Sequence, residues 1–161
     1  LADARCPFLW VNGTNDFAYW PESWFGSARL VQAGSSLCMT LRMPHGHGGP
    51  GENPPEILAF MDHSLRGGQP LASIVSQKLE GRTISAKFTG AEGCPVVRAE
   101  LLYTTSDNPD WPSRRWEVIP AQLDTHYNLA SADFPEGARC GFINLLDTRG
   151  LTVSSDLAML A

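Results

Sequence analysis

The chain has 161 residues, of which 43% are hydrophobic and 18% charged, so it is expected to form one compact unit or two small ones. Seventeen acidic residues against twelve basic ones give a net charge of -5, and no stretch concentrates Lys and Arg. A nucleic-acid partner is therefore not expected. The apolar runs, such as Pro7 to Val11, stop far short of the roughly 20 residues that span a bilayer, so no membrane span is expected.

The beginning of the chain predicts a piece of a longer protein. It opens on Leu1-Ala2-Asp3 without Met and reaches an apolar strand almost at once. Any signal peptide would then lie upstream, and the compartment cannot be read from targeting.

Four cysteines, Cys6, Cys38, Cys94 and Cys140, are widely separated along the chain. No Cys-x-x-Cys pair and no zinc-finger spacing occurs, so we do not expect a metal cluster. Free buried thiols are the favoured interpretation, and a disulfide between Cys94 and Cys140 is the alternative.

Residues 1–68 read as strand, helix, strand, helix. A near-continuous apolar run over residues 6–12 ends at Gly13 and predicts a strand covered on both faces. A helix is expected over residues 21–31 and a second strand over residues 37–43. Asn53 then looks like the N-cap of a second helix, with Glu56 closing a capping box and Gly67-Gly68 ending it. The buried face of that helix is expected to consist of Ile57, Leu58, Phe60, Met61 and Leu65.

This order predicts a parallel α/β sheet. Two parallel strands alone would leave long unpaired edges and too small a core. We therefore expect further strands from a missing N-terminal part, from a companion polypeptide, or from a second copy that covers the sheet edge.

Residues 69–161 show short alternating runs between turn signals and no long helical pattern. Candidate strands span residues 72–77, 83–88, 97–104, 115–119, 125–129, 139–146 and 151–155. They predict an antiparallel β-sandwich of immunoglobulin or fibronectin type III character. The expected division is thus an α/β segment over residues 1–68 and an accessory sandwich over residues 69–161.

An acid and two imidazoles follow successive strands of the α/β segment. Asp16 comes after the first strand, and His45 and His47 after the second. Open α/β sheets place their sites at these carboxyl ends. A carboxylate beside a His fixes its tautomer and stabilises the imidazolium formed when it takes a proton from a nucleophile. Asp16 could instead cap the helix that begins near Pro21 or close an Asx-turn. The two histidines could be plain loop residues or a His-x-His pair of metal ligands, but no third ligand lies nearby in the sequence, so no metal site is expected.

Aromatic residues cluster next to Asp16. Phe17, Tyr19 and Trp20 could wall a substrate pocket there, and packing against the first helix is an equally good interpretation.

Three motifs of residues 1–68 carry a family resemblance. Residues 6–19 (CPFLWVNGTNDFAY), 43–48 (MPHGHG) and 54–57 (PPEI) resemble the C-terminal third of a bacterial acetyl xylan esterase-like α/β-hydrolase of the prolyl-oligopeptidase type. Residues 99–105, 147–151 and 154–155 resemble the β-sandwich appended to some of these enzymes.

The resemblance implies a serine esterase that acts on acetylated carbohydrate without a cofactor and is periplasmic or secreted. Asp16 would be the acid of the triad. His47 is the preferred triad histidine, because His47-Gly48 before a capped helix is similar to the family's His-Gly element, and His45 is the alternative.

The chain departs from this family in one respect, since it contains no Gly-x-Ser-x-Gly motif. The nearest segment, residues 34–38, reads as a turn. The nucleophile is therefore expected outside this chain, which would be inactive by itself. A fragment of a prolyl-oligopeptidase-type peptidase, or a non-catalytic sandwich that binds carbohydrate or protein, are the alternatives.

Overall fold

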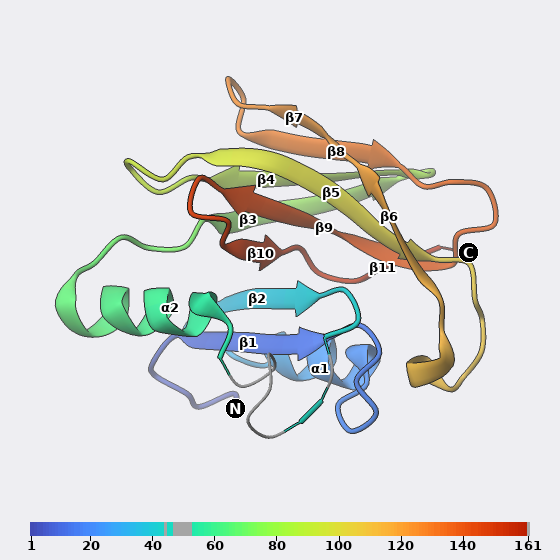
Figure 1. The fold of residues 1–161 in the computed structure, drawn as a ribbon, viewed down its shortest axis with the longest axis horizontal. Coiled ribbons are helices and arrows are strands. Elements are labelled where there is room, and N and C mark those ends of the chain that lie inside the picture. Colours follow the sequence, from blue (N-terminus) through green and yellow to red (C-terminus); the bar gives the residue numbers. More distant parts are fainter. Residues whose placement is uncertain (44, 47–52, 161) are drawn as a thin grey trace.

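The computed structural model describes residues 1–43, 45–46 and 53–160. Its first part holds two parallel strands, β1 (Phe8–Gly13) and β2 (Ser35–Thr40), joined through α1 (Pro21–Ala28). Helix α2 (Pro55–Arg66) follows and leads into the β-rich remainder. In Figure 1 this first part forms the lower layer, with α2 at one end of it.

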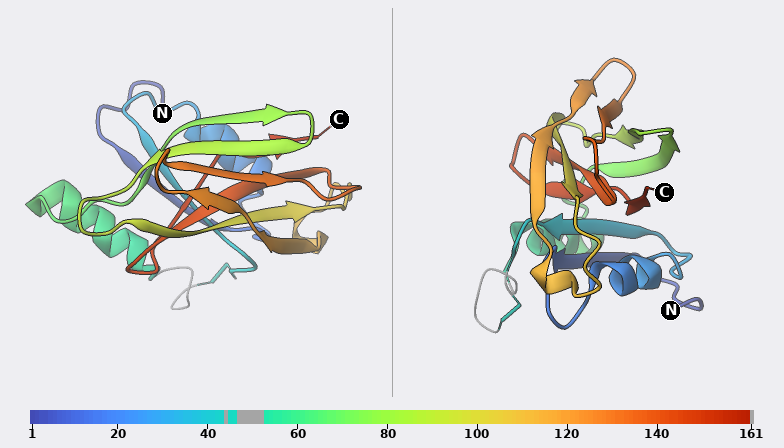
Figure 2. Two further views of the ribbon diagram at one scale, coloured as in Figure 1. Left: turned by 90° about the horizontal axis from the view of Figure 1, so that it is seen from above. Right: turned by 90° about the vertical axis from the view of Figure 1, so that its right-hand side faces the viewer.

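All pairings from β3 onward are antiparallel. One sheet has the order β3-β4-β8-β7, and the other has the order β10-β9-β5-β6, with β11 pairing to β9. In Figure 1 the strands β5 and β9 pass in front of β3 and β4, and the left view of Figure 2 shows β3 and β4 (green) on the opposite side from β5 (yellow). The strands are β3 (Ser73–Glu80), β4 (Thr83–Thr89), β5 (Val96–Thr104), β6 (Trp116–Pro120), β7 (Gln122–Asp124), β8 (Leu129–Asp133), β9 (Cys140–Asp147), β10 (Thr152–Ser154) and β11 (Ala158–Met159), with a short 3-10 helix over Trp111–Ser113.

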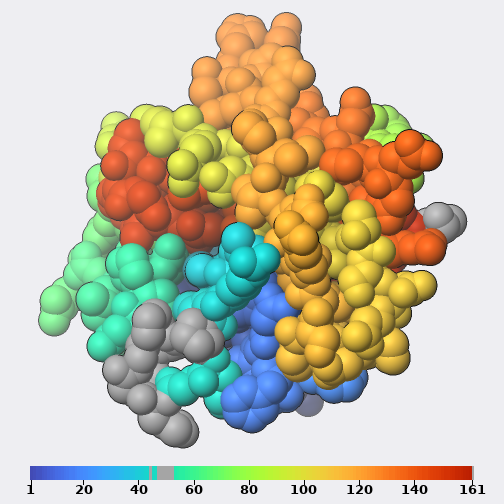
Figure 3. Space-filling view, turned by 45° about the vertical axis from the view of Figure 1, so that its right-hand side comes forward, coloured from blue at the N-terminus to red at the C-terminus, as the bar shows by residue number. Residues whose placement is uncertain are grey.

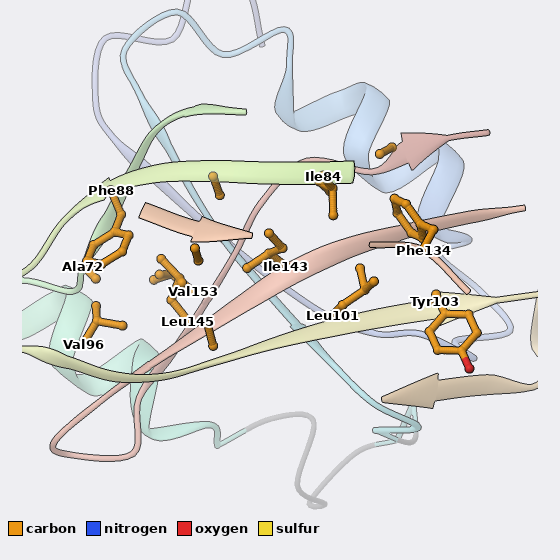
Figure 4. Packing of buried hydrophobic residues seen from close by; sticks show 14 of the residues in the cluster. Ala72, Ile84, Phe88, Val96, Leu101, Tyr103, Phe134, Ile143, Leu145 and Val153 are labelled. Atoms are coloured by element: carbon orange, nitrogen blue, oxygen red, sulfur yellow. The ribbon is translucent and has the colours of Figure 1, made fainter. Parts of the chain in front are cut away.

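The larger core lies between these two sheets. Alternate residues of β4 and β9, such as Ile84 and Ile143, point inward and are fully buried, as strand periodicity requires. Figure 4 shows how Phe88, Leu101 and Leu145 fill the same layer. Burial of these side chains, at roughly 1.5 to 3 kcal/mol each, is the main source of stability for this part.

A second buried cluster joins the first part of the chain to the sandwich. Trp24, Phe25 and Met39 pack with Trp116 and Phe142, and all five are less than 8% exposed. Strand β2 also lies beside β10, where the Met39 amide donates to Ser154 Oγ at 2.8 Å and Asn144 Nδ2 donates to the Met39 carbonyl at 3.0 Å. The division at residues 68 and 69 stays a prediction, and the segments on its two sides share this core.

The predicted fold class, the C-terminal portion of an α/β-hydrolase sheet, is wrong. The structure is 42% strand and 15% helix, and parallel pairing among the described strands is confined to β1 and β2. The physical reason is visible in α2, whose predicted apolar face is only partly covered: Leu58, Met61 and Leu65 are 68%, 50% and 74% exposed, while Ala59 and Phe60 pack against the larger core. The β-rich character expected for residues 69–161 fits in part.

The start of α2 also differs from the expectation. Pro54 is the N-cap, without a side-chain cap, and Glu56 is the buried residue of the helix. Glu56 Oε1 accepts the main-chain N–H of Thr152 at 2.8 Å, so its carboxylate ties α2 to β10 instead of closing a capping box. Gly67 ends the helix as predicted, with φ of 72° in the left-handed region.

No helix among the described residues is both long and apolar enough to pass through a bilayer.

All four cysteines are free thiols, which confirms the favoured interpretation, although Cys6 is exposed while Cys38, Cys94 and Cys140 are buried. Burial, followed by the charge of Glu56, raises the pKa of Cys38 to about 12. Burial likewise raises the pKa of Cys140 to about 11, against the opposing influence of Arg114.

These thiols should react very unequally with iodoacetamide, because only the thiolate attacks. At pH 8 a thiol with a pKa of about 12 is ionised in roughly one molecule in 10⁴, so Cys38 should stay unmodified while Cys6 is alkylated. Peptide mass spectrometry of the native protein would locate the adducts, and unfolding in denaturant should make Cys38 and Cys140 reactive. Rapid native alkylation of Cys38 would contradict its burial.

Candidate functional site

The loop after β1 holds Asp16 in a fixed orientation. The chain turns sharply, with the Asp16 amide donating to the Gly13 carbonyl at 3.2 Å. Asp16 Oδ1 then accepts the amides of Ala18 and Tyr19 at 2.7 and 2.8 Å, which closes an Asx-turn. The residue is 5% exposed, and its second oxygen, Oδ2, points to the histidine described next.

His45 meets that oxygen. Its Nδ1 lies 2.8 Å from Asp16 Oδ2. A carboxylate can only accept, so the imidazole donates from Nδ1, and in the neutral ring Nε2 is then the basic nitrogen. The ring is 30% exposed and lies between Phe17 and Tyr19, with ring centroids 4.8 and 5.6 Å away. The pair can therefore take a proton from a hydroxyl group presented to Nε2.

A groove lies along the aromatic residues that follow Asp16. It has a volume of about 550 Å³ and is lined by Leu1, Trp10, Phe17, Ala18, Tyr19, Trp20, Ser23, Trp24 and Ser27. Phe17, Tyr19 and Trp20 are 66%, 63% and 40% exposed, so their rings are available to a ligand. Phe17 and Tyr19 also contact His45, which is not itself a lining residue, so these two rings connect the groove to the imidazole.

Of the predicted site residues, the structure thus brings together Asp16, His45, Phe17 and Tyr19, with Trp20 further along the groove. His47, the preferred triad histidine, lies outside the described residues. Ser35 and Ser36, interpreted as part of a turn, belong to strand β2.

The described residues provide the pair with neither a serine nucleophile nor a metal site. Among the described residues no serine hydroxyl is hydrogen-bonded to His45, whose side chain pairs with Asp16. Nor do the described residues hold a group of three or more His, Cys, Asp or Glu side chains that could hold a metal ion.

Four polar residues around the pair were not identified from the sequence, namely Asn12, Thr14, Asn15 and Arg42. Asn12 Nδ2 donates to the Tyr19 carbonyl at 2.6 Å, and its Oδ1 accepts the Gly13 amide at 2.9 Å. Thr14 Oγ1 accepts the Arg42 amide at 3.0 Å. The signal available was a polar run, Asn12-Gly13-Thr14-Asn15, placed directly after an apolar strand.

Comparison with known proteins identifies no family for this chain. No family model matches the sequence, and no curated protein matches it. Among solved structures, a crystal structure of pectate lyase PelI from Erwinia chrysanthemi in complex with tetragalacturonic acid is similar at a TM-score of 0.31 and 18% identity. The match covers 54% of this chain and 27% of the lyase chain.

The resemblance to acetyl xylan esterase-like α/β-hydrolases is therefore wrong. It finds no matching family model, and the structure is mostly β-sheet with few helices. The motifs that carried the resemblance are short. Residues 6–19 cover β1 and the loop after it, and residues 54–57 cover the start of α2, so they constrain local structure without fixing the sheet around it.

Proposed function

We propose that Asp16 and His45 are the acid and the general base of a hydrolytic site that cleaves an ester, with a serine hydroxyl supplied by a polypeptide segment outside residues 1–161. The observation that carries the proposal is the 2.8 Å contact between His45 Nδ1 and the buried Asp16 carboxylate. Burial of the carboxylate strengthens its interaction with an imidazolium, because fewer water molecules screen it.

The proton steps follow from that contact. His45 Nε2 accepts the hydroxyl proton while the hydroxyl oxygen attacks the acyl carbon, and the Asp16 carboxylate stabilises the resulting imidazolium. The imidazolium then gives this proton to the departing alcohol. A water molecule, deprotonated in turn by His45, releases the acid from the nucleophile. General acid–base catalysis of this kind contributes about 10²- to 10⁴-fold.

The aromatic groove is the proposed subsite for the part of the substrate that does not react. Exposed faces of Phe17, Tyr19 and Trp20 offer flat apolar surfaces, with Ser23 and Ser27 as hydroxyl partners along the wall. Flat rings with scattered hydroxyl groups suit the face of a sugar ring. A carbohydrate ester is accordingly the proposed substrate class.

The free edge of β1 is the proposed contact for the polypeptide that brings the nucleophile. Main-chain amides of Phe8 and Thr14 donate toward β2, to the carbonyls of Gly34 and Thr40. In a parallel strand the intervening residues, including Leu9 and Val11, then face the opposite edge. Within the described part of the chain β1 pairs with β2 alone, so this edge is open to a further strand.

The test uses the protein expressed from its complete gene and a fluorophosphonate, which reacts with an activated serine. We expect one adduct, on a serine outside residues 1–161. His45→Ala should lower the labelling rate by about 10²- to 10⁴-fold, because the base that activates the hydroxyl is removed. His126→Ala, at an exposed turn between β7 and β8, is the matched control and should label like the unchanged protein.

Two outcomes would overturn the proposal. One is equal labelling of the His45→Ala variant and the unchanged protein. The other is an adduct on a serine within residues 1–161, located by peptide mass spectrometry.

A further inference from the structure

Asn15 joins the site to the sandwich. Its Nδ2 donates to two main-chain carbonyls, that of Pro112 at 2.9 Å and that of Arg114 at 2.7 Å. Both protons of the amide are used in this way, by acceptors nearly a hundred residues away in sequence. We propose that Asn15 is a positioning residue through which the sandwich holds the Asp16–His45 pair in register, an inference that rests on the proposed function.

A second set of contacts extends this hold to the histidine. Thr14 Oγ1 donates to Asn15 Oδ1 at 2.9 Å and accepts the Arg42 amide at 3.0 Å. Arg42 has φ of 51°, in the left-handed region, and its Nη2 donates to the Trp116 carbonyl at 3.3 Å. Arg42 lies three residues before His45. Main-chain carbonyls of residues 112–116 therefore bind both the loop of the acid, through Asn15, and the segment that leads to the base, through Arg42.

The segment that Asn15 contacts is itself held in place by buried and stacked side chains. Trp111 and Trp116 are 2% and 1% exposed and stack with ring centroids 6.2 Å apart. The Arg114 guanidinium lies 3.6 Å above the Trp111 ring and donates to the Asn108 carbonyl at 2.7 Å. In Figure 3 the gold surface of this segment lies directly against the blue surface of the chain near the first strand.

The contact requires an amide at position 15. An aspartate has nearly the same shape but offers only acceptors, so its carboxylate would face two carbonyl oxygens and be repelled. The Asp16 loop would then separate from residues 111–116. A displacement of about 1 Å between reacting groups costs about 10²-fold in rate, even when the change is remote from the chemistry.

The test therefore compares Asn15→Asp with Asn108→Asp. Asn108 Oδ1 accepts the Asp110 amide at 2.9 Å, so its replacement adds the same charge to the same region and keeps its acceptor. We expect Asn15→Asp to lower the fluorophosphonate labelling rate by about 10²-fold and Asn108→Asp to leave it within twofold. The second readout is the nitrogen-15 spectrum of labelled histidine, in which His45 should change from a single Nδ1–H tautomer to a mixture in Asn15→Asp alone.

A second pair of variants covers the case in which Asn15→Asp does not fold. Thr14→Val removes the hydroxyl that links Asn15 to Arg42, and Thr14→Ser keeps it. The valine variant should show the mixed tautomer and slow labelling, and the serine variant should restore both readouts.

The outcomes separate this inference from the proposed function. If His45→Ala slows labelling while Asn15→Asp and Thr14→Val match the unchanged protein in rate and tautomer, the positioning role is wrong and the proposed function stands. If the tautomer changes in Asn15→Asp but labelling never depends on His45, the positioning is right and the proposed function is wrong.

Discussion

Replacing Asp16 by Asn is expected to lower the rate of fluorophosphonate labelling by about 10⁴-fold while the fold persists. The new side chain can keep its oxygen toward the amides of Ala18 and Tyr19, which Asp16 Oδ1 accepts at 2.7 and 2.8 Å. Its amino group then faces His45 Nδ1, where Asp16 Oδ2 stood. Since that group donates, the imidazole must accept at Nδ1 and carry its proton on Nε2, where it can no longer act as a base.

The chain contains a matched control for this variant. Asp124 closes a turn of the same kind, its Oδ1 accepting the amides of His126 and Tyr127 at 2.9 and 3.0 Å. Asp124→Asn should label at the rate of the unchanged protein. Circular dichroism would establish that both variants are folded, and an Asp16→Asn rate within tenfold of the unchanged protein would contradict the role given to the carboxylate.

Truncating Phe142 to Ala should cost about 3 to 5 kcal/mol of unfolding free energy, the typical loss for a buried aromatic side chain. Phe142 is 0% exposed, and its ring lies 5.8 Å from that of Phe25 and 5.7 Å from that of Trp116. These two neighbours lie on different elements, α1 and β6, and cannot both move inward to fill the space, so a cavity remains.

Urea unfolding followed by tryptophan fluorescence and by circular dichroism measures this loss. Tyr127→Ala is the control, because Tyr127 is 66% exposed and its removal should change stability by less than about 0.5 kcal/mol. A loss below about 1 kcal/mol for Phe142→Ala would mean that this cluster is not closely packed.

Local elements were largely predictable, since apolar periodicity and turn residues are local signals. The predicted strand over residues 83–88 corresponds to β4 (Thr83–Thr89), and that over residues 139–146 to β9 (Cys140–Asp147). The strand expected over residues 125–129 is wrong, because the chain turns there between β7 and β8. Its Asp124 side chain caps that turn, and β-compatible residues such as Thr125 and Tyr127 concealed it.

The arrangement of the elements was not predictable in the same way. Periodicity shows that α2 has one apolar side, yet it cannot show whether a sheet is present to cover Leu58 and Leu65. Of the site, Asp16 could be proposed together with His47 or His45, because all three follow strands whose ends meet, although the sequence led us to prefer His47. Asn15 could not, because its partners, the carbonyls of Pro112 and Arg114, are main-chain groups that leave no mark in the sequence.

The buried cluster around Phe25, Trp116 and Phe142 limits which substitutions this chain can accept during evolution. Residues in contact do not contribute independently, so a larger ring at one of these positions requires a smaller one at another. A substitution in the part of this cluster that belongs to the Asp16 segment must therefore be compensated by a substitution in the part that belongs to the sandwich. Recombination that gave residues 1–68 a foreign sandwich would bring mismatched rings into this cluster, and we expect such a chimera to be less stable than the unchanged chain.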